Sequence, residues 1–182
     1  QYDADGNMLL DDEGMPVFGE DMVYVGPSAP TREFALTNTF TLFGDVQLYV
    51  FMDYKGGHYL FNMSEQTSVS TDGNHRIMND PTLSREEYLR LNHGGNAPYI
   101  ERADFIKLRE VSISYNLPSQ WANVIGANGL SLTLAGRNLA VWSKYSGADP
   151  EVNIGGSATF TRADYMSVPM MRNFSASLNF TF

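Results

Sequence analysis

The first residues of the sequence that could bind a metal ion lie close to its start. Asp3, Asp5 and Asn7 stand at the i, i+2 and i+4 spacing with which calcium-binding loops begin. The glycine of such a loop comes one position early, at Gly6, and the twelfth position holds no glutamate. Asp3, Asp5 and Asn7 are therefore a candidate calcium site, with an Asp-Gly turn in a solvated loop as the alternative.

The histidines and the adjacent glutamates show no catalytic pattern. His58, His75 and His93 lack the spacing of metal ligands, so we expect them in solvated loops. Glu86 and Glu87 fit the solvated face of a helix. Because no triad, pair of carboxylates or phosphate-binding loop stands out, we predict that the chain is not an enzyme and binds no cofactor.

The amino-acid composition excludes several classes of protein and of binding partner. The 182 residues carry 21 acidic and 12 basic side chains, a net charge of −9 that argues against a nucleic-acid partner. There is no cysteine, hence no disulfide or thiolate site. The many Gly, Tyr and Phe residues favour strands and turns. No run of about 18 apolar residues is present to form a membrane helix. The absence of a signal peptide fits a segment of a longer chain or a mature secreted product.

Five segments alternate between apolar and polar residues, as strands with two different faces do. Two antiparallel hairpins are predicted at residues 31–55 and 104–143, and a final strand at 171–182. The apolar phase changes within the second hairpin, which predicts a bulge near Arg109 or Glu110. The apolar positions of the final strand are Phe174, Ala176, Leu178, Phe180 and Phe182.

Short helices are predicted in the connections. Asp80 is a candidate cap with Pro81 at the first helical position, and Ser84 with Glu87 has capping-box spacing. Residues 119–125 suit one short helical turn before a glycine.

The connections between strands alternate in length. Residues 1–30, 56–103 and 144–170 are long intervals, whereas Gly44-Asp45 and residues 119–128 are short. This asymmetry is typical of outer-membrane β-barrels, whose outer loops are long and whose periplasmic turns are short. Aromatic residues near strand ends suit interfacial girdles. They are Phe43, Tyr115, Trp121, Trp142, Tyr145 and Phe182.

Five strands are too few to close a barrel, because about eight is the smallest number. We therefore expect an incomplete barrel. The alternative is a secreted β-sandwich that binds carbohydrate between its long loops, and a sandwich would have to cover the apolar face with a second sheet.

Three stretches carry a resemblance to a known family: ADFIKLREVSISYNLP, LAGRNLAVWSKYSGADPEVN and VPMMRNFSASLNFTF. They resemble the carboxy-terminal end of SusC/RagA-type TonB-dependent outer-membrane transporters. The hairpin around residues 23–62 looks like the preceding part of that family. The most specific elements are Arg137-Asn138-Leu139 and the Tyr-x-Gly-x-Asp-Pro-Glu stretch at residues 145–151.

This resemblance implies an all-β, antiparallel fold, in which the chain supplies the last five strands of a barrel of about 22 strands. Residues 1–30, 56–103 and 144–170 would be extracellular loops carrying short helices, and the other segments would cross the outer membrane. The family imports oligosaccharides or peptides with a SusD-like surface lipoprotein. It is energised by a TonB complex, which would contact upstream parts absent from this chain.

The faces of the strands give two groups of candidate functional residues. The polar face is predicted to line the lumen, while the apolar face contacts outer-membrane lipid. The lumen-facing candidates are Glu33, Gln47, Asp53, Ser112, Ser114, Thr133, Asn173 and Asn179. The resemblance further implies that the barrel-insertion machinery reads an assembly signal in the final strand, at Leu178, Phe180 and Phe182.

Overall fold

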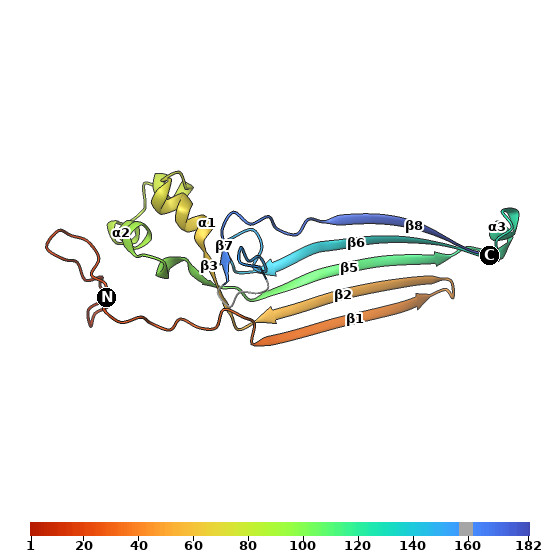
Figure 1. Cartoon of the computed structure of the whole chain (residues 1–182), viewed down its shortest axis with the longest axis horizontal. Coiled ribbons are helices and arrows are strands. Elements are labelled where there is room, and N and C mark those ends of the chain that lie inside the picture. The colour runs from red at the N-terminus through yellow and green to blue at the C-terminus, as the bar shows by residue number, and fades with distance from the viewer. Residues whose placement is uncertain (157–161) are drawn as a thin grey trace. The chain divides into compact units, whose positions relative to one another are not determined.

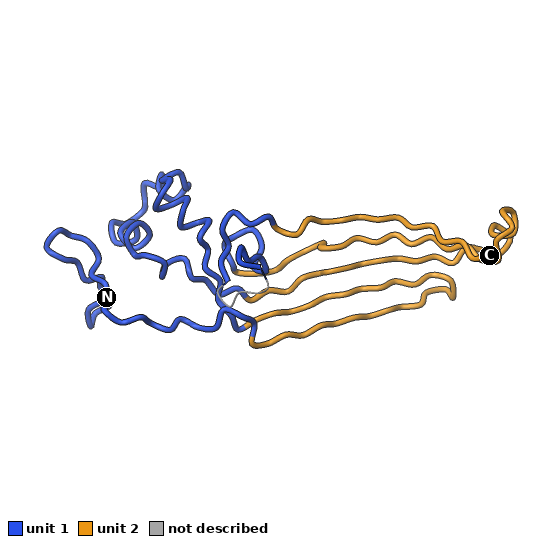
Figure 2. Tube along the Cα trace, viewed as in Figure 1, with its two compact units in different colours: residues 1–30, 57–103, 145–168 blue, residues 31–56, 104–144, 169–182 orange. Residues whose placement is uncertain are grey.

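The computed structural model describes residues 1–156 and 162–182, which form two compact units (Figures 1 and 2). The sheet unit comprises Thr31–Gly56, Asp104–Lys144 and Pro169–Phe182. The loop unit comprises Gln1–Pro30, Gly57–Ala103 and Tyr145–Val168. Of the long interval predicted at 144–170, residues 157–161 lie outside the described part of the chain.

The sheet unit contains one antiparallel sheet with the strand order β1-β2-β5-β6-β8. Its strands are β1 (Arg32–Leu42), β2 (Val46–Gly56), β5 (Phe105–Asn116), β6 (Gly129–Ser143) and β8 (Asn173–Thr181). These are the five segments in which apolar and polar residues alternate. Strands that follow one another along the chain in this sheet are also neighbours in space. Among the described residues, β1 and β8 are the two edges of this sheet, which does not close on itself.

Short connections join β1 to β2 and β5 to β6. Between Leu42 and Val46, Phe43 and Gly44 both have a positive φ, 55° and 87°, so the chain reverses within three residues. The second connection contains α3 (Ser119–Val124), the helical turn that the sequence predicts.

Bulges interrupt the centre of the sheet. Phe51, Glu110 and Arg137 are paired across β2, β5 and β6, and the next paired set is Met52, Leu108 and Ala140. Between these two sets β2 has no extra residue. Over the same step β5 has one extra residue, Arg109, and β6 has two, Asn138 and Leu139. The bulge predicted near Arg109 is confirmed, and the larger one on β6 is an addition to the sequence-based prediction. Bulges increase the local twist and bend of a sheet.

The loop unit has a small sheet and several short helices. In the sheet, β3 (Tyr59–Asn62) pairs antiparallel with β4 (Ile100–Arg102) and parallel with β7 (Ala163–Asp164). The helices are α1 (Met63–Gln66), a π-helical turn (Thr67–Thr71), 3-10 helices (Arg76–Asn79 and Ala97–Tyr99) and α2 (Arg85–His93). The five predicted strands are antiparallel as expected, whereas the parallel pair β3–β7 lies in intervals for which no strand was predicted.

Helix α2 begins where one of two predicted caps lies. The Ser84 hydroxyl accepts the backbone N–H of Glu87 at 3.1 Å, which satisfies one of the free donors of the first turn. Asp80 is not the N-cap, because its carboxylate accepts the Thr82 backbone N–H at 2.9 Å in a separate turn. Leu89 and Leu91 are the buried residues of α2.

Two apolar clusters form the core of the loop unit. One joins Leu60, Ala103 and Tyr145. The other joins Val69, Leu91 and Tyr99, with Phe61, Ile77 and Met78 packed against it. Among the described residues, no helix has both the length and the apolar character needed to span a membrane.

Candidate functional site

The strand register assigns all eight lumen-facing candidates to the same face of the sheet. Ser114 pairs with Gln47 of β2 and Thr133 of β6, so the three form one row. Paired residues in adjacent strands share a face, and every second residue of a strand returns to it. Further rows of this polar face join Glu33 to Lys55, Asp53 to Lys107, Ser112 to Tyr49, Asn173 to Arg137, and Asn179 to Ser131.

The polar face divides into a hydroxyl-rich part and a charged part. In the first, the hydroxyl groups of Ser114 and Thr133 lie 2.9 Å apart. In the second, beside the bulges, the Arg109 guanidinium donates two hydrogen bonds of 2.8 Å to the Asp53 carboxylate. Both side chains are largely buried, at 15% and 13% exposure. A bidentate Arg–carboxylate pair has one preferred geometry, so it fixes the direction of the bulged residue.

A second ion pair and a side-chain amide hold the β6 bulge. Arg137 donates from Nε to Glu110 Oε2 at 2.8 Å across the β5–β6 ladder. Asn138 has a φ of 53°, a left-handed conformation that Asn adopts more readily than most residues, and its Nδ2 donates to the Met171 carbonyl at 3.2 Å. The Arg-Asn-Leu element that carries part of the resemblance is therefore the bulge itself.

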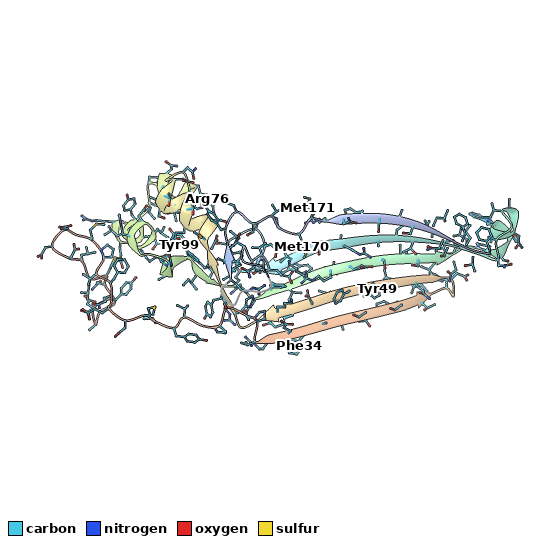
Figure 3. The ribbon with its side chains drawn as sticks, viewed as in Figure 1. Phe34, Tyr49, Arg76, Tyr99, Met170 and Met171 are labelled. Atoms are coloured by element: carbon cyan, nitrogen blue, oxygen red, sulfur yellow. The ribbon has the colours of Figure 1, made fainter. Side chains whose placement is uncertain are left out.

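The opposite face of the sheet is apolar and exposed. Phe40, Leu48, Ile113, Leu134 and Ala176 form one row across all five strands. Figure 3 labels one residue of each face, Phe34 on the apolar side and Tyr49 on the polar side. The large apolar residues exposed on this face are Phe34, Leu36, Phe40, Leu42, Ile106, Ile113, Tyr115, Leu132, Leu134, Trp142, Phe174, Leu178 and Phe180.

The proposed assembly residues belong to this apolar face or to its end. Leu178 pairs with Leu132 and Phe180 with Leu130, both on β6. Phe182 follows the last residue of β8 and is 80% exposed. Of the aromatic residues expected at strand ends, Tyr145 is the exception, because it is 7% exposed and belongs to the core of the loop unit. The expectation of an interfacial role for Tyr145 is therefore wrong.

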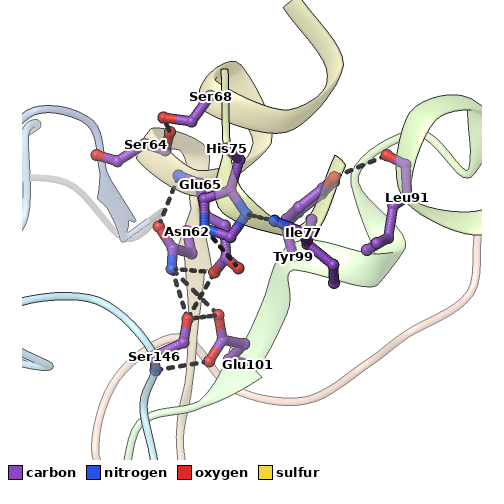
Figure 4. A network of polar contacts seen from close by, with 10 residues as sticks. All are labelled: Asn62, Ser64, Glu65, Ser68, His75, Ile77, Leu91, Tyr99, Glu101 and Ser146. Carbon is purple, nitrogen blue, oxygen red and sulfur yellow. Dashed lines mark hydrogen bonds and ion pairs between the residues drawn. The ribbon is translucent and has the colours of Figure 1, made fainter. Parts of the chain in front are cut away.

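A polar network in the loop unit connects segments that are distant in sequence (Figure 4). Asn62 Nδ2, at the end of β3, donates to Glu65 Oε2 at 3.0 Å, Glu101 Oε1 at 3.1 Å and Ser146 Oγ at 2.8 Å. Ser146 lies 2.7 Å and 2.6 Å from the same two carboxylates. The network ties α1, β4 and the start of the third interval together, and the sequence analysis did not find it.

Two buried tyrosines strengthen the same unit. Tyr99 donates to the Leu91 carbonyl at 2.7 Å, and burial raises the pKa of Tyr99 to about 12. Tyr145 donates to Asp164 Oδ2 at 3.0 Å, and burial, followed by the negative charge of Asp164, raises the pKa of Tyr145. Both hydroxyls therefore stay protonated and serve as hydrogen-bond donors.

The candidate calcium residues form a turn that uses their oxygens. Asp3 Oδ1 accepts the backbone N–H groups of Asp5 at 2.9 Å and Asn7 at 2.8 Å, and Asn7 Nδ2 donates to Asp3 Oδ2 at 3.1 Å. These bonds lower the pKa of Asp3, the Asn7 side chain first. This Asx turn accounts for the spacing without a metal. Within residues 1–156 and 162–182, no three His or acidic side chains gather as metal ligands would.

The histidines differ from one another in their surroundings. His58 is 1% exposed, so the expectation of a solvated position is wrong for it. His75 accepts the Ile77 N–H at Nδ1 and lies 4.0 Å from a Glu65 oxygen, half-buried. His93, at the end of α2, is exposed.

Comparisons with known proteins extend these observations. No family model matches the sequence. The chain is 34% identical over 89 residues to TonB-dependent receptor P3 of Formosa agariphila, which is 46% of this chain and 9% of that protein. It is 26% identical over 179 residues to TonB-dependent receptor P26 of the same organism, 90% of this chain and 18% of that protein. The chain thus spans less than a fifth of the length of these relatives.

Solved structures show the same fold. The RagAB peptide importer in its open-open state matches 97% of this chain with a TM-score of 0.68 and 19% identity, over 20% of the importer chain. Its closed-closed state matches 96% of this chain with a TM-score of 0.64 and 18% identity, again over 20%. The chain is thus similar in sequence to part of TonB-dependent receptors, and it has the fold of part of the RagAB peptide importer.

Proposed function

We propose that the sheet unit is a section of the wall of an outer-membrane β-barrel that imports nutrients. Its apolar face would contact lipid and its polar face would line the lumen. The observation that carries this proposal is the in-register, exposed apolar face, which runs over all five strands. Exposed apolar surface is unfavourable in water by about 25 cal/mol per Å². Lipid removes that cost, and a barrel wall alternates apolar outward and polar inward.

The secreted β-sandwich is less well supported. A sandwich buries its inner apolar face under a second sheet. Here Phe34 and Leu36 remain 67% and 58% exposed, and Phe180 remains 45% exposed. The bare face favours the barrel wall.

Finer features of the proposal follow from the resemblance and from relatives. The complete barrel would have about 22 strands, of which these would be the last five, and residues 1–30, 56–103 and 144–170 would be outer loops. The structures of the RagAB peptide importer support a surface lipoprotein of the SusD type as partner. The cargo would be a peptide or an oligosaccharide, and a TonB complex would act through upstream parts.

Cysteine labelling of the full-length receptor in lipid vesicles tests the two faces. The 182 residues of this sequence contain no cysteine, and any cysteine elsewhere in the receptor is first replaced by serine. Adjacent positions provide matched pairs: Gln47→Cys against Leu48→Cys, and Thr133→Cys against Leu134→Cys. We expect a hydrophilic maleimide to label the first member of each pair, whereas brominated lipid quenches a fluorophore attached at the second. Equal labelling and equal quenching within both pairs would contradict the wall.

A further inference from the structure

A pocket of about 340 Å³ lies within the loop unit. The first segment of the chain contributes Tyr2, Met8 and Phe18, and the end of α2 with the following residues contributes Arg90, Ala97 and Pro98. This volume is within the range of small-ligand pockets.

The walls of the pocket are mostly apolar, and their polar side chains are those of Gln1, Tyr2 and Arg90. Met8, Phe18, Ala97 and Pro98 have none in their side chains. The Arg90 guanidinium is turned to its own helix, because its Nε and Nη2 each donate to the Glu87 carboxylate at 2.7 Å. A sugar entering this pocket would lose water from many hydroxyl groups and regain partners for only a few of them, at Gln1 and Tyr2, which is unfavourable. An apolar side chain has no such requirement.

Two acidic turns adjoin the pocket. Tyr2 and Met8 flank the turn at Asp3–Asn7. They pair with each other and line the pocket. A second turn of the same kind follows at Asp11–Met15, where Asp11 Oδ1 accepts the N–H groups of Glu13 and Met15 at 2.9 Å.

The charge of this segment is one-sided. Residues 1–21 contain no Lys or Arg. Their acidic residues are Asp3, Asp5, Asp11, Asp12, Glu13, Glu20 and Asp21. On α2, by contrast, two arginines balance two glutamates. The Arg85 guanidinium reaches Gly14 in the second turn and offsets part of this charge. The remaining exposed acidic groups attract cations and repel anions.

We propose that this pocket binds an apolar side chain of a peptide whose neighbouring residues are Lys or Arg, which the acidic turns attract. The inference rests on the proposed import function and gives it a substrate class, cationic-apolar peptides. Neutral oligosaccharides fit the apolar walls less well, and anionic cargo is repelled by the turns.

Binding to the purified full-length receptor in detergent tests the pocket without requiring transport. The probes are acetyl-Lys-Lys-Leu-Lys-Lys-amide, the same peptide with Ser in place of Leu, the same peptide with Glu in place of Lys, and maltohexaose. We expect the leucine peptide to bind at least about tenfold more tightly than the serine peptide, from burial of one leucine side chain. The glutamate peptide and maltohexaose should bind more weakly still.

Two sets of variants separate the walls from the charges. Ala97→Trp fills the pocket and should weaken the leucine peptide at least about tenfold, whereas Ala148→Trp, an exposed position of the same unit outside the pocket, should not. Asp5→Asn, Asp12→Asn and Glu13→Gln together retain Asp3 and Asp11, which hold the turns. This triple variant should reduce the preference for Lys over Glu peptides, and added salt should do the same.

Any of the following results would overturn the proposal: equal binding of the leucine and serine peptides, equal effects of the two Trp variants, or maltohexaose binding that Ala97→Trp removes. Absence of binding by every probe would also overturn it. None of these outcomes bears on the cysteine labelling of the two faces, so failure of the pocket and failure of the barrel wall remain distinguishable.

Discussion

Arginine substitution at two neighbouring residues of β8 measures which face of the sheet meets lipid. Ala176 lies on the apolar face in the row of Leu134 and Ile113, and Ser177 lies on the polar face opposite Thr133. Both side chains are exposed. The pair therefore differs mainly in the direction of the side chain.

The expected magnitudes differ widely. An arginine at the lipid-facing midplane of a barrel costs about 2–4 kcal/mol, so Ala176→Arg should lower the folding equilibrium constant by about 30- to 1,000-fold. Ser177→Arg places its guanidinium among hydroxyl groups and water, where surface substitutions change stability by about 0.5 kcal/mol or less.

The assay is a denaturant titration that measures reversible unfolding of the full-length receptor in lipid vesicles. We expect a large decrease in the free energy of unfolding for Ala176→Arg and a small change for Ser177→Arg. Equal decreases, or a larger one for Ser177→Arg, would refute the assignment of the faces.

Further predictions concern assembly, topology, charge pairing and pH. Phe182→Arg should cost about 0–1 kcal/mol if this residue lies at the membrane interface, yet reduce membrane levels in cells; normal levels would leave β8 as a wall strand without an assembly signal. Asp45→Cys should be protected from a surface label on intact cells and Asp72→Cys should react, because the first lies in a short turn and the second in a long interval; the opposite result would invert the topology. Arg109→Ala should destabilise the receptor by about 3–5 kcal/mol in denaturant titration, because the Asp53 carboxylate, 13% exposed, loses its partner, whereas Arg109→Lys should restore part of the loss; an unchanged midpoint for Arg109→Ala would contradict this. The folded-state pKa of Tyr99 is raised to about 12, so its contribution is complete below about pH 10 and is lost as pH rises toward 12; Tyr99→Phe should remove this part of the alkaline loss of stability, and an unchanged pH profile would contradict it.

The five long strands could be predicted because alternation is a local signal. The single extra residue at Arg109 was also visible, since one inserted residue shifts the phase of the apolar positions. The larger bulge at Asn138 and Leu139 gave no such signal, because two inserted residues restore the phase. The periodicity of apolar residues therefore reveals the insertion of an odd number of residues in a strand but not of an even number.

The loop unit was less predictable because distant residues define it. Strand β3 pairs with β7 about 100 positions away, and β7 has only two residues. The network of Asn62, Glu65, Glu101 and Ser146 joins three separate segments, and single polar residues in loops give no indication of their partners. Tyr145 was expected at an interface because it lies near a strand end, but its position in the core depends on contacts with Leu60 and Ala103.

The unequal bulges of β5 and β6 affect the curvature of the sheet separately from the face on which each side chain lies. If Arg109, Asn138 and Leu139 were all deleted, Leu108 would precede Glu110, and Arg137 would precede Ala140, in uninterrupted alternation. Every remaining side chain would keep its face, while the extra bend and twist would disappear. The inserted residues thus add curvature and the contacts of Arg109 and Asn138, but they do not determine which residues lie on the apolar face and which on the polar face. A shortened receptor of this kind would show whether its assembly depends on the bend of the wall or only on its chemistry.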